Sequence, residues 1–349
     1  MGKNGAPLRY FLGANTADGF YSCYEDFPPR EDACLWYIKG GPGNGKSTLM
    51  RSVARAAGNL GMQAECALCS GDPDSLDGVY LREARLGYVD ATSPHVQEPG
   101  EPGAGGQYLD MSGCYRPGLA AHREQIRELF RLYREQYARS YALLDAAALA
   151  APELIPGLVG AADRAGAAER ADAMISGLVR PEGGYRAQRR FLSVYSCQGC
   201  LSLWDEVEAE RFFTLDDRFG LADAFLQALR ARCRESGCRV ILCPDPLRPS
   251  RLEGLILPEQ SIAFAAVKDP GRSPRPGGEH VPLAAAAGED ALRSREFLGC
   301  RETRDRLLQQ AVGALRKAKD LHDRLEALYR PYVDFSAVDA LIREQLERL

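Results

Sequence analysis

The sequence predicts an α/β fold in which a strand–helix–strand unit occurs twice. Short apolar runs of strand length alternate with segments of helical periodicity, which is typical of parallel sheets flanked by helices. Residues 9–90 are also similar to residues 189–266. Hydrophobic residues make up 45% of the 349-residue chain and charged residues 26%, the balance of a globular protein. We therefore expect three layers in each copy, a parallel sheet with helices on its faces.

The elements of the first copy follow from hydrophobic periodicity. Residues 34–39 are a short apolar run and predict a strand, and residues 63–69 predict a second one. Residues 86–89 predict a third, which ends at Asp90. Between the first two strands, residues 46–59 predict a helix. Its apolar face has spacings of three and four and consists of Leu49, Met50, Val53, Ala54 and Ala57.

The internal repeat appears as matches between residues at two constant sequence offsets. Residues 9–12 match residues 189–192 at an offset of 180, and the offset then becomes 176 after a deletion. At that second offset Trp36 stands opposite Phe212 and Leu76 opposite Leu252. One offset that persists over so many positions favours duplication of one unit over two unrelated halves.

Helical segments follow each copy and set the expected domain boundary. Residues 98–118 and 269–288 are rich in glycine and proline and predict long surface loops. Charged helical segments come next, and their charges are more often solvated faces than ligands. A Pro-Glu-Gly-Gly sequence begins at Pro181. We expect a first domain at residues 1–180 with a helical extension, and a second at residues 187–349 with C-terminal helices.

Residues 40–48 carry the clearest chemistry in the chain. They match the pattern G-x-x-x-x-G-K-[ST], with an apolar strand before them and a helix after them. Glycines let backbone N–H groups approach a phosphate, and the N-terminus of the following helix attracts the anion. The motif predicts a phosphate-binding loop (P-loop) for a nucleoside triphosphate, ATP by preference. Its residues are Gly40, Gly41, Pro42, Gly43, Asn44, Gly45, Lys46, Ser47 and Thr48.

Catalytic and metal-binding roles are expected around this loop. Lys46 would reach the β- and γ-phosphates, and Ser47 would offer its hydroxyl to Mg²⁺. Asp90, at the end of a buried strand, would complete the magnesium site. Many ATPases place a glutamate directly after this aspartate, but Ala91 follows here, so no general base is identified. Further candidates at the carboxyl edge of the sheet are Asp72, Asp74, Asp77 and His95. Each has a structural alternative, as an Asx turn or as a structural histidine.

The second copy lacks the chemistry of the first. Opposite the lysine and the serine of the loop stand Ala222 and Asp223, and three aspartates occupy residues 216–223. Ala266 stands opposite Asp90. A phosphate would be repelled by these carboxylates. We therefore expect a degenerate partner copy that does not bind Mg²⁺ and nucleotide.

Taken together, these residues resemble a known family. Residues 11–16, the loop from residue 39 to 49, residues 72–79 and residues 90–95 are similar to an uncharacterised group of bacterial tandem P-loop ATPases. The resemblance covers nearly the whole chain and is strongest over residues 9–97. It implies a duplicated P-loop NTPase fold and ATP binding. Members usually keep a phosphate loop in both copies, and this chain departs from the family there.

Charge and hydropathy limit the partners that we expect. The net charge is −4 and the sequence pI is about 5.8, which makes nucleic acid an unlikely partner. No apolar run is long enough to cross a membrane, and no secretory signal is evident, so we expect a cytoplasmic protein. An unidentified protein or small molecule is left as the partner besides ATP.

Three functions fit these expectations. The first is a slow Mg²⁺-dependent ATPase that uses Lys46 and Asp90. The second is a small-molecule or nucleotide kinase, although the loop at residues 98–118 holds a single arginine, Arg116, where kinases close an arginine-bearing lid. The third is a nucleotide-dependent switch or scaffold without turnover, which the degenerate second copy and Ala91 favour.

Overall fold

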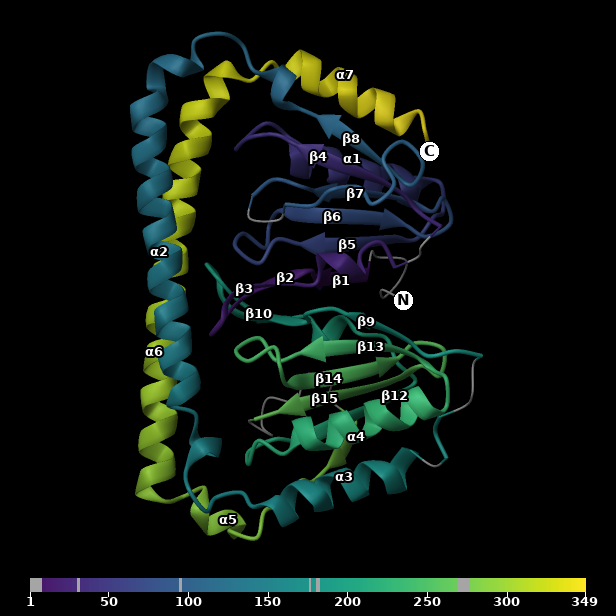
Figure 1. Cartoon of the computed structure of the whole chain (residues 1–349), viewed down its shortest axis with the longest axis vertical. Coiled ribbons are helices and arrows are strands. Elements are labelled where there is room, and N and C mark those ends of the chain that lie inside the picture. The colour runs from purple at the N-terminus through teal and green to yellow at the C-terminus, as the bar shows by residue number, and fades with distance from the viewer. Residues whose placement is uncertain (1–7, 30–31, 94–95, 176, 180–182, 269–276) are drawn as a thin grey trace.

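The computed structural model places two six-stranded sheets beside a pair of long helices (Figure 1). It describes residues 8–29, 32–93, 96–175, 177–179, 183–268 and 277–349. No helix in this part of the chain is both long and apolar enough to cross a bilayer.

The first sheet has the strand order β1-β5-β6-β7-β4-β8. Five strands are parallel, whereas β6 runs antiparallel to both of its neighbours. The expectation of a purely parallel sheet was therefore wrong. It failed because the acidic stretch that contains the candidates Asp72, Asp74 and Asp77 leads directly into β6, which includes Asp77. The strands are β1 (Leu8–Phe11), β4 (Cys34–Lys39), β5 (Ala64–Leu68), β6 (Leu76–Leu81), β7 (Leu86–Asp90) and β8 (Gly106–Asp110).

The second sheet repeats this order strand for strand, as β9-β13-β14-β15-β12-β16. The single antiparallel strand, β14, lies at the same place as β6. The register irregularity between Ala67 and Leu68 recurs between Cys243 and Pro244. The strands are β9 (Arg186–Arg189), β12 (Arg211–Asp216), β13 (Arg239–Pro244), β14 (Leu252–Leu257), β15 (Ile262–Val267) and β16 (Glu279–Val281).

One strand of the repeat is shifted by a residue from its expected alignment. Trp36 on β4 pairs with Tyr88 and stacks on it, and Phe213 on β12 pairs with Phe264 and stacks on it in the same way. Trp36 therefore corresponds to Phe213 rather than to Phe212. The loop that follows β12 is accordingly one residue shorter than the loop that follows β4.

A small antiparallel sheet joins the two halves. Its order is β11-β10-β2-β3, and its strands are β2 (Gly13–Thr16), β3 (Gly19–Ser22), β10 (Ser193–Ser196) and β11 (Gly199–Ser202). Asn15 pairs with Tyr195, and Phe11 exchanges two backbone hydrogen bonds with Phe191. Residues separated by 180 positions thus face each other, as residues beside a two-fold axis do.

Helices pack on a single face of each sheet. Helices α1 (Lys46–Asn59) and α7 (Phe335–Leu346) lie together on the first, and α4 (Ala222–Glu235) and α3 (Ala161–Ile175) lie together on the second. The opposite faces are covered by the 3₁₀ turns η2 (Tyr24–Asp26) and η6 (Trp204–Glu206) and the residues after them. The three-layer expectation was therefore wrong for the described residues, since turns rather than helices form the third layer.

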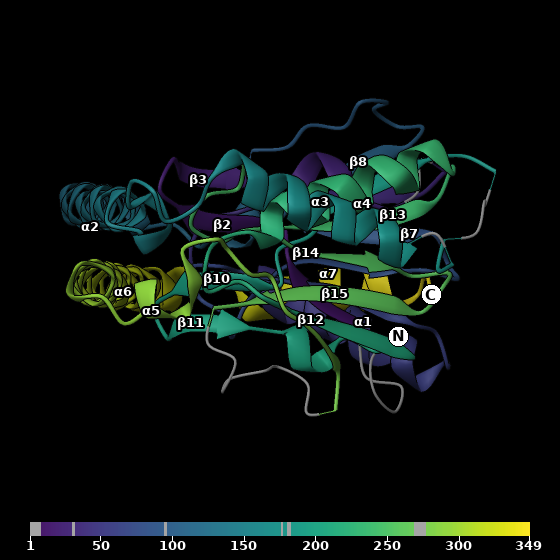
Figure 2. The same ribbon diagram turned by 90° about the horizontal axis from the view of Figure 1, so that it is seen from below.

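The long helices α2 (Arg123–Leu149) and α6 (Arg295–Tyr329) pack side by side along both halves (Figure 1), and Figure 2 views the pair end-on. Helix α2 leaves the first half and leads to α3, which packs on α4 in the second. Helix α6 returns and leads to α7, which packs on α1. Each copy therefore lends its helical extension to the core of the other.

The glycine-rich stretches contain more regular structure than expected. Residues 98–118, expected as a loop, include β8 and the turn η3 (Ser112–Cys114). The backbone of β8 pairs with β4, and so a strand of only 5 residues extends the first sheet. The remaining short helices are η4 (Leu119–His122), η5 (Pro152–Leu154), α5 (Gly288–Ala291) and η8 (Arg330–Tyr332).

Candidate functional site

The glycine-rich loop of residues 40–48 connects β4 to α1 at the carboxyl edge of the first sheet. Gly43 has a φ of 67° and Gly45 a φ of 92°, and both values lie in the left-handed region that favours glycine. Gly45 is the N-cap residue, directly before α1. The two glycines therefore let the chain turn from the strand into the helix within a few residues.

Lys46 and Asp90 lie together beside this loop. The Lys46 Nζ donates to the carbonyl oxygens of Gly40 and Gly41, at 2.9 Å each. It lies 3.8 Å from Asp90 Oδ2, and the two side chains are 14% and 13% exposed. The pairing arises because β4 and β7 are parallel neighbours, with Ile38 opposite Asp90. Two residues that the sequence predicted to share a site are thus in contact.

Ser47 and Asp90 present oxygens of the kind that Mg²⁺ prefers. The Ser47 Oγ accepts a hydrogen bond from the Leu76 N–H at 3.0 Å. Asp90 Oδ1 accepts from the Thr92 N–H at 2.9 Å, which leaves Oδ2 facing the Lys46 ammonium. A hydroxyl and a carboxylate beside a lysine fit magnesium together with a phosphate group.

Several polar groups of the loop have no partner among the described residues. The backbone N–H groups of residues 45–48 donate to no acceptor among the residues that the structure describes. The Asn44 side chain is 1% exposed, and neither its oxygen nor its nitrogen is hydrogen-bonded in this part of the chain. Unpaired donors at the start of a helix are the groups that bind an anion in phosphate sites.

Helices from the end of the chain pack directly against the loop. A Cβ added at Gly43 would lie 3.5 Å from the Glu326 Cβ of α6, and one at Gly45 would lie 2.9 Å from a Val338 methyl group of α7. Tyr115 donates its hydroxyl to the Pro42 carbonyl oxygen. No local pattern indicated Glu326 or Val338 as neighbours of the loop, because both lie far along the chain on helices whose charges were interpreted as solvated.

Around Glu326, helix α6 gathers further titratable groups. Ligand atoms of His322, Asp323 and Glu326 lie within 4.8 Å of one another. Burial lowers the pKa of His322, against the carboxylate of Glu326, which raises it. A carboxylate and an imidazole therefore lie on the helix that covers the loop.

The other predicted acidic residues have separate partners. Asp72 lies 3.6 Å from Lys319 of α6 and accepts from the Ser75 hydroxyl. Asp74 accepts from the Gln198 amide of the second half at 2.9 Å. Asp77 is buried and accepts from the Tyr24 hydroxyl at 2.9 Å. These contacts favour structural roles, and His95 lies outside the described residues.

The corresponding loop of the second half is closed by its own side chains. Asp217 accepts from the Ala222 N–H at 2.7 Å, so a carboxylate lies at the start of α4. Burial raises the pKa of Asp217 to about 6. Arg251 donates to the Gly220 carbonyl oxygen at 2.8 Å. A cavity of about 210 Å³ beside this loop is smaller than the roughly 300 Å³ of typical ligand pockets.

One hydrogen bond shows how closely the two loops correspond. The Leu252 N–H donates to Asp223 Oδ1 at 2.9 Å, at the place where the Leu76 N–H donates to the Ser47 hydroxyl. The contact persists while the residue type changes from serine to aspartate. Comparisons of the chain with protein-family models, curated proteins and solved structures found no match.

Proposed function

We propose that the chain binds ATP with Mg²⁺ at residues 40–48 and hydrolyses it slowly. The observation that carries the proposal is the contact of Lys46 with Asp90 beside a glycine-rich loop whose N–H groups at residues 45–48 have no described acceptor. This is the strand–loop–helix arrangement of P-loop nucleotide sites. The repeated strand order supports the further proposal that both halves derive from one P-loop NTPase unit.

The described residues would have separate roles in binding the phosphates and the metal. The loop N–H groups and the Lys46 ammonium would hold the phosphates and stabilise the charge that develops on them. Ser47 and Asp90 would hold the metal. Bound Mg²⁺ supplies Lewis-acid stabilisation of the phosphate oxygens. Glu326 of α6 lies beside the loop through its backbone and Cβ, and its carboxylate faces His322.

A steady-state ATPase assay with Mg²⁺ tests the hydrolysis. We expect slow turnover by the wild-type protein and a loss of at least about tenfold in Asp90→Asn, since one charged metal ligand becomes neutral. Equal turnover in both proteins would remove Asp90 from the mechanism. A rate that rises with an added acceptor, and not with Mg²⁺ and ATP alone, would favour the kinase.

A nucleotide-dependent switch is the second candidate, and one observation favours it. Helices α6 and α7 contact the loop at Gly43 and Gly45, and α6 also extends into the second half. A bound phosphate would thus change the surroundings of a helix that both halves share. Saturable ATP binding without measurable turnover would favour the switch over the ATPase.

A further inference from the structure

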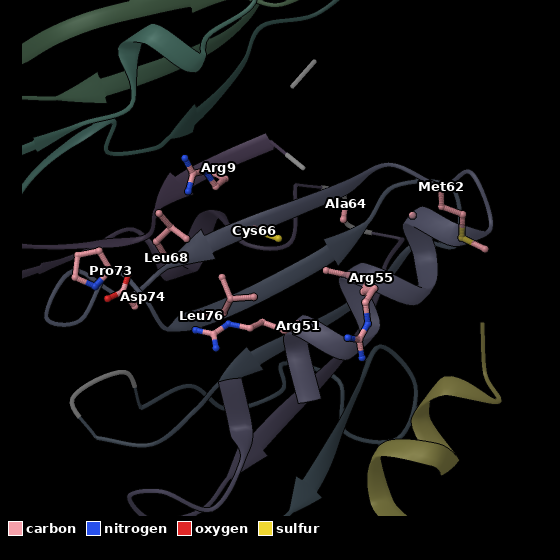
Figure 3. Close-up of a pocket in the computed structure, with 12 residues that line it drawn as sticks. Arg9, Arg51, Arg55, Met62, Ala64, Cys66, Leu68, Pro73, Asp74 and Leu76 are labelled. Carbon is pink, nitrogen blue, oxygen red and sulfur yellow. The ribbon is translucent and has the colours of Figure 1, made fainter. Parts of the chain in front are cut away.

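A cavity lies away from the glycine-rich loop, on the flank of α1 that α7 leaves uncovered. It has a volume of about 530 Å³, within the range of roughly 300–1,000 Å³ that is typical of ligand sites. Helix α1 forms one wall, and strands β1 and β5 form the floor (Figure 3). The site that binds the phosphates in our proposal and this cavity are therefore different places.

The floor of the cavity is apolar. Ala64, Cys66 and Leu68 alternate along β5 and so share one face of the strand. Met62 and Ala54 extend this apolar surface to the helix. Burial raises the pKa of the Cys66 thiol to about 11, so this cysteine is a small hydrophobic residue here rather than a thiolate.

Three arginines surround this floor. Arg51 and Arg55 lie one turn apart on α1, and Arg9 lies on β1 opposite Cys66. Arg9 is bound by the Glu206 carboxylate of the second half. Neither Arg51 nor Arg55 forms an ion pair with any residue that the structure describes. The carboxylate among the lining residues, Asp74, is held by Gln198.

The corresponding place in the second half carries different side chains. At an offset of 176, Arg51 and Arg55 correspond to Gln227 and Ala231, and Gly58 corresponds to Arg234. There Arg234 lies over the Tyr185 ring, 5.9 Å from its centroid. The second half thus has neither arginine of α1 at this place, and an arginine–tyrosine contact lies beside it.

We propose that this cavity binds an organic anion, a small molecule with an apolar body and one carboxylate or phosphate group. The apolar body would lie on the β5 floor, and the anionic group would be bound by Arg51 and Arg55. Guanidinium groups bind carboxylates and phosphates through paired N–H donors, so both headgroups belong to the same ligand chemistry. The proposal does not depend on nucleotide binding.

Titration with the fluorescent anion 8-anilinonaphthalene-1-sulfonate tests this proposal on the full chain. We expect saturable binding of one molecule to the wild type. The double variant Arg51→Gln/Arg55→Gln should bind at least about tenfold more weakly, because losing about 1.4 kcal/mol of charge pairing lowers the affinity tenfold. Arg123→Gln/Arg127→Gln is the matched control, since these two exposed arginines have the same spacing on α2. It should bind like the wild type.

Separate experiments test the apolar part of the site and the choice of headgroup. Ala54→Phe should abolish binding by filling the cavity, with the circular dichroism of the wild type confirming its fold. Octanoate and octyl phosphate share a chain and differ in the anionic group, so displacement of the dye by one or both identifies the headgroup, whereas octanol should be weaker. Equal affinity in wild type and Arg51→Gln/Arg55→Gln, an equal loss in the control pair, or displacement by neither anion would overturn the proposal.

Discussion

Tyr24 and Asp77 form a buried hydrogen bond that recurs in the second half with both residues changed. The Tyr24 hydroxyl donates to Asp77, and the Trp204 indole N–H donates to Glu253 at 3.1 Å. Each pair joins a 3₁₀ turn to the antiparallel strand of its sheet. The repeat therefore preserves the contact rather than the residues, and the contact gives the acidic residue at Asp77 a structural partner.

Glu253 should make the stability of the protein fall as the pH rises from about 4.5 to about 8. Burial raises its pKa from the ordinary 4.5 to about 8, with Asp245 adding to the effect. Between these values the folded chain holds a proton that the unfolded chain has released, so the free energy of unfolding decreases with pH. Asp217, with a pKa of about 6, acts in the same direction at lower pH.

The substitution Glu253→Gln tests this dependence. A neutral amide cannot titrate, so the variant should lose less stability between about pH 6 and pH 8 than the wild type does. Urea unfolding at the two pH values gives the difference. The same decrease in both proteins would show that Glu253 does not hold the raised pKa.

Gly45 combines a left-handed backbone with a close neighbour. Its φ of 92° disfavours a side chain, and an added Cβ would lie 2.9 Å from a Val338 methyl group. Gly45→Ala should therefore destabilise the chain by about 1 kcal/mol or more. Gly313→Ala is the control, because a Cβ there meets nothing within 4 Å inside α6, and it should stabilise by about 0.5–1 kcal/mol. Thermal unfolding that ranks the two variants in the opposite order would contradict this account.

The secondary-structure elements that the sequence predicts correctly are those whose own residues show a clear hydrophobic pattern. The bounds of β4 and α1 agree with the expected residues 34–39 and 46–59, because an apolar run and a 3.6-residue stripe each define their own element. Strands of 4 residues such as β1 and β2 carry too little pattern to be recognised. The antiparallel β6 was missed because its acidic and glycine residues are typical of turns.

The candidate site was likewise predictable only where local sequence patterns specify it. Lys46, Ser47 and Asp90 lie on or next to strands of one sheet edge, so a motif and a strand end were enough to bring them together. Glu326 and Val338 reach the loop through packing of helices that are distant in the chain, and Tyr115 reaches it from the segment after β8. No local pattern specifies such contacts.

The start of α7 offers an element-level prediction. The Asp334 carboxylate accepts from the Ser336 and Ala337 N–H groups and so caps the helix. Asp334→Ala should cost about 1 kcal/mol of stability, the usual effect of losing such a cap. Asp290→Ala is the matched control, because the Asp290 side chain is 99% exposed and should change stability by less than about 0.5 kcal/mol. Equal urea midpoints for the two variants would argue against the cap.

Across the whole molecule, the exchange of helices ties the two halves together. The larger core contains residues of the first half together with residues of the second, among them Ile342 of α7 and Phe212 of β12. The second core joins α3 from one extension to α4. Because neither half buries its sheet with its own helices alone, we expect the chain to unfold as one cooperative unit.

The two tryptophans report on this cooperativity. Trp36 lies in the first sheet and Trp204 against the second, and the chain has no others. In Trp36→Phe and in Trp204→Phe, the remaining tryptophan should give a urea transition that coincides with the loss of circular dichroism in the same protein. A fluorescence transition that clearly precedes the loss of circular dichroism in either variant would show that the halves unfold separately.

Equilibrium binding of ATP with Mg²⁺ to the wild type and to Lys46→Ala tests the central claim most directly. Lys46 contributes a charged donor to the phosphates, so its loss should weaken binding about 10- to 100-fold. Lys317→Ala removes an exposed lysine of α6 and should bind like the wild type. Saturable binding by the wild type and by Lys317→Ala, with clear weakening in Lys46→Ala, is the result that we predict. Absence of binding by the wild type, or equal affinity in all three proteins, would contradict a nucleotide site at residues 40–48.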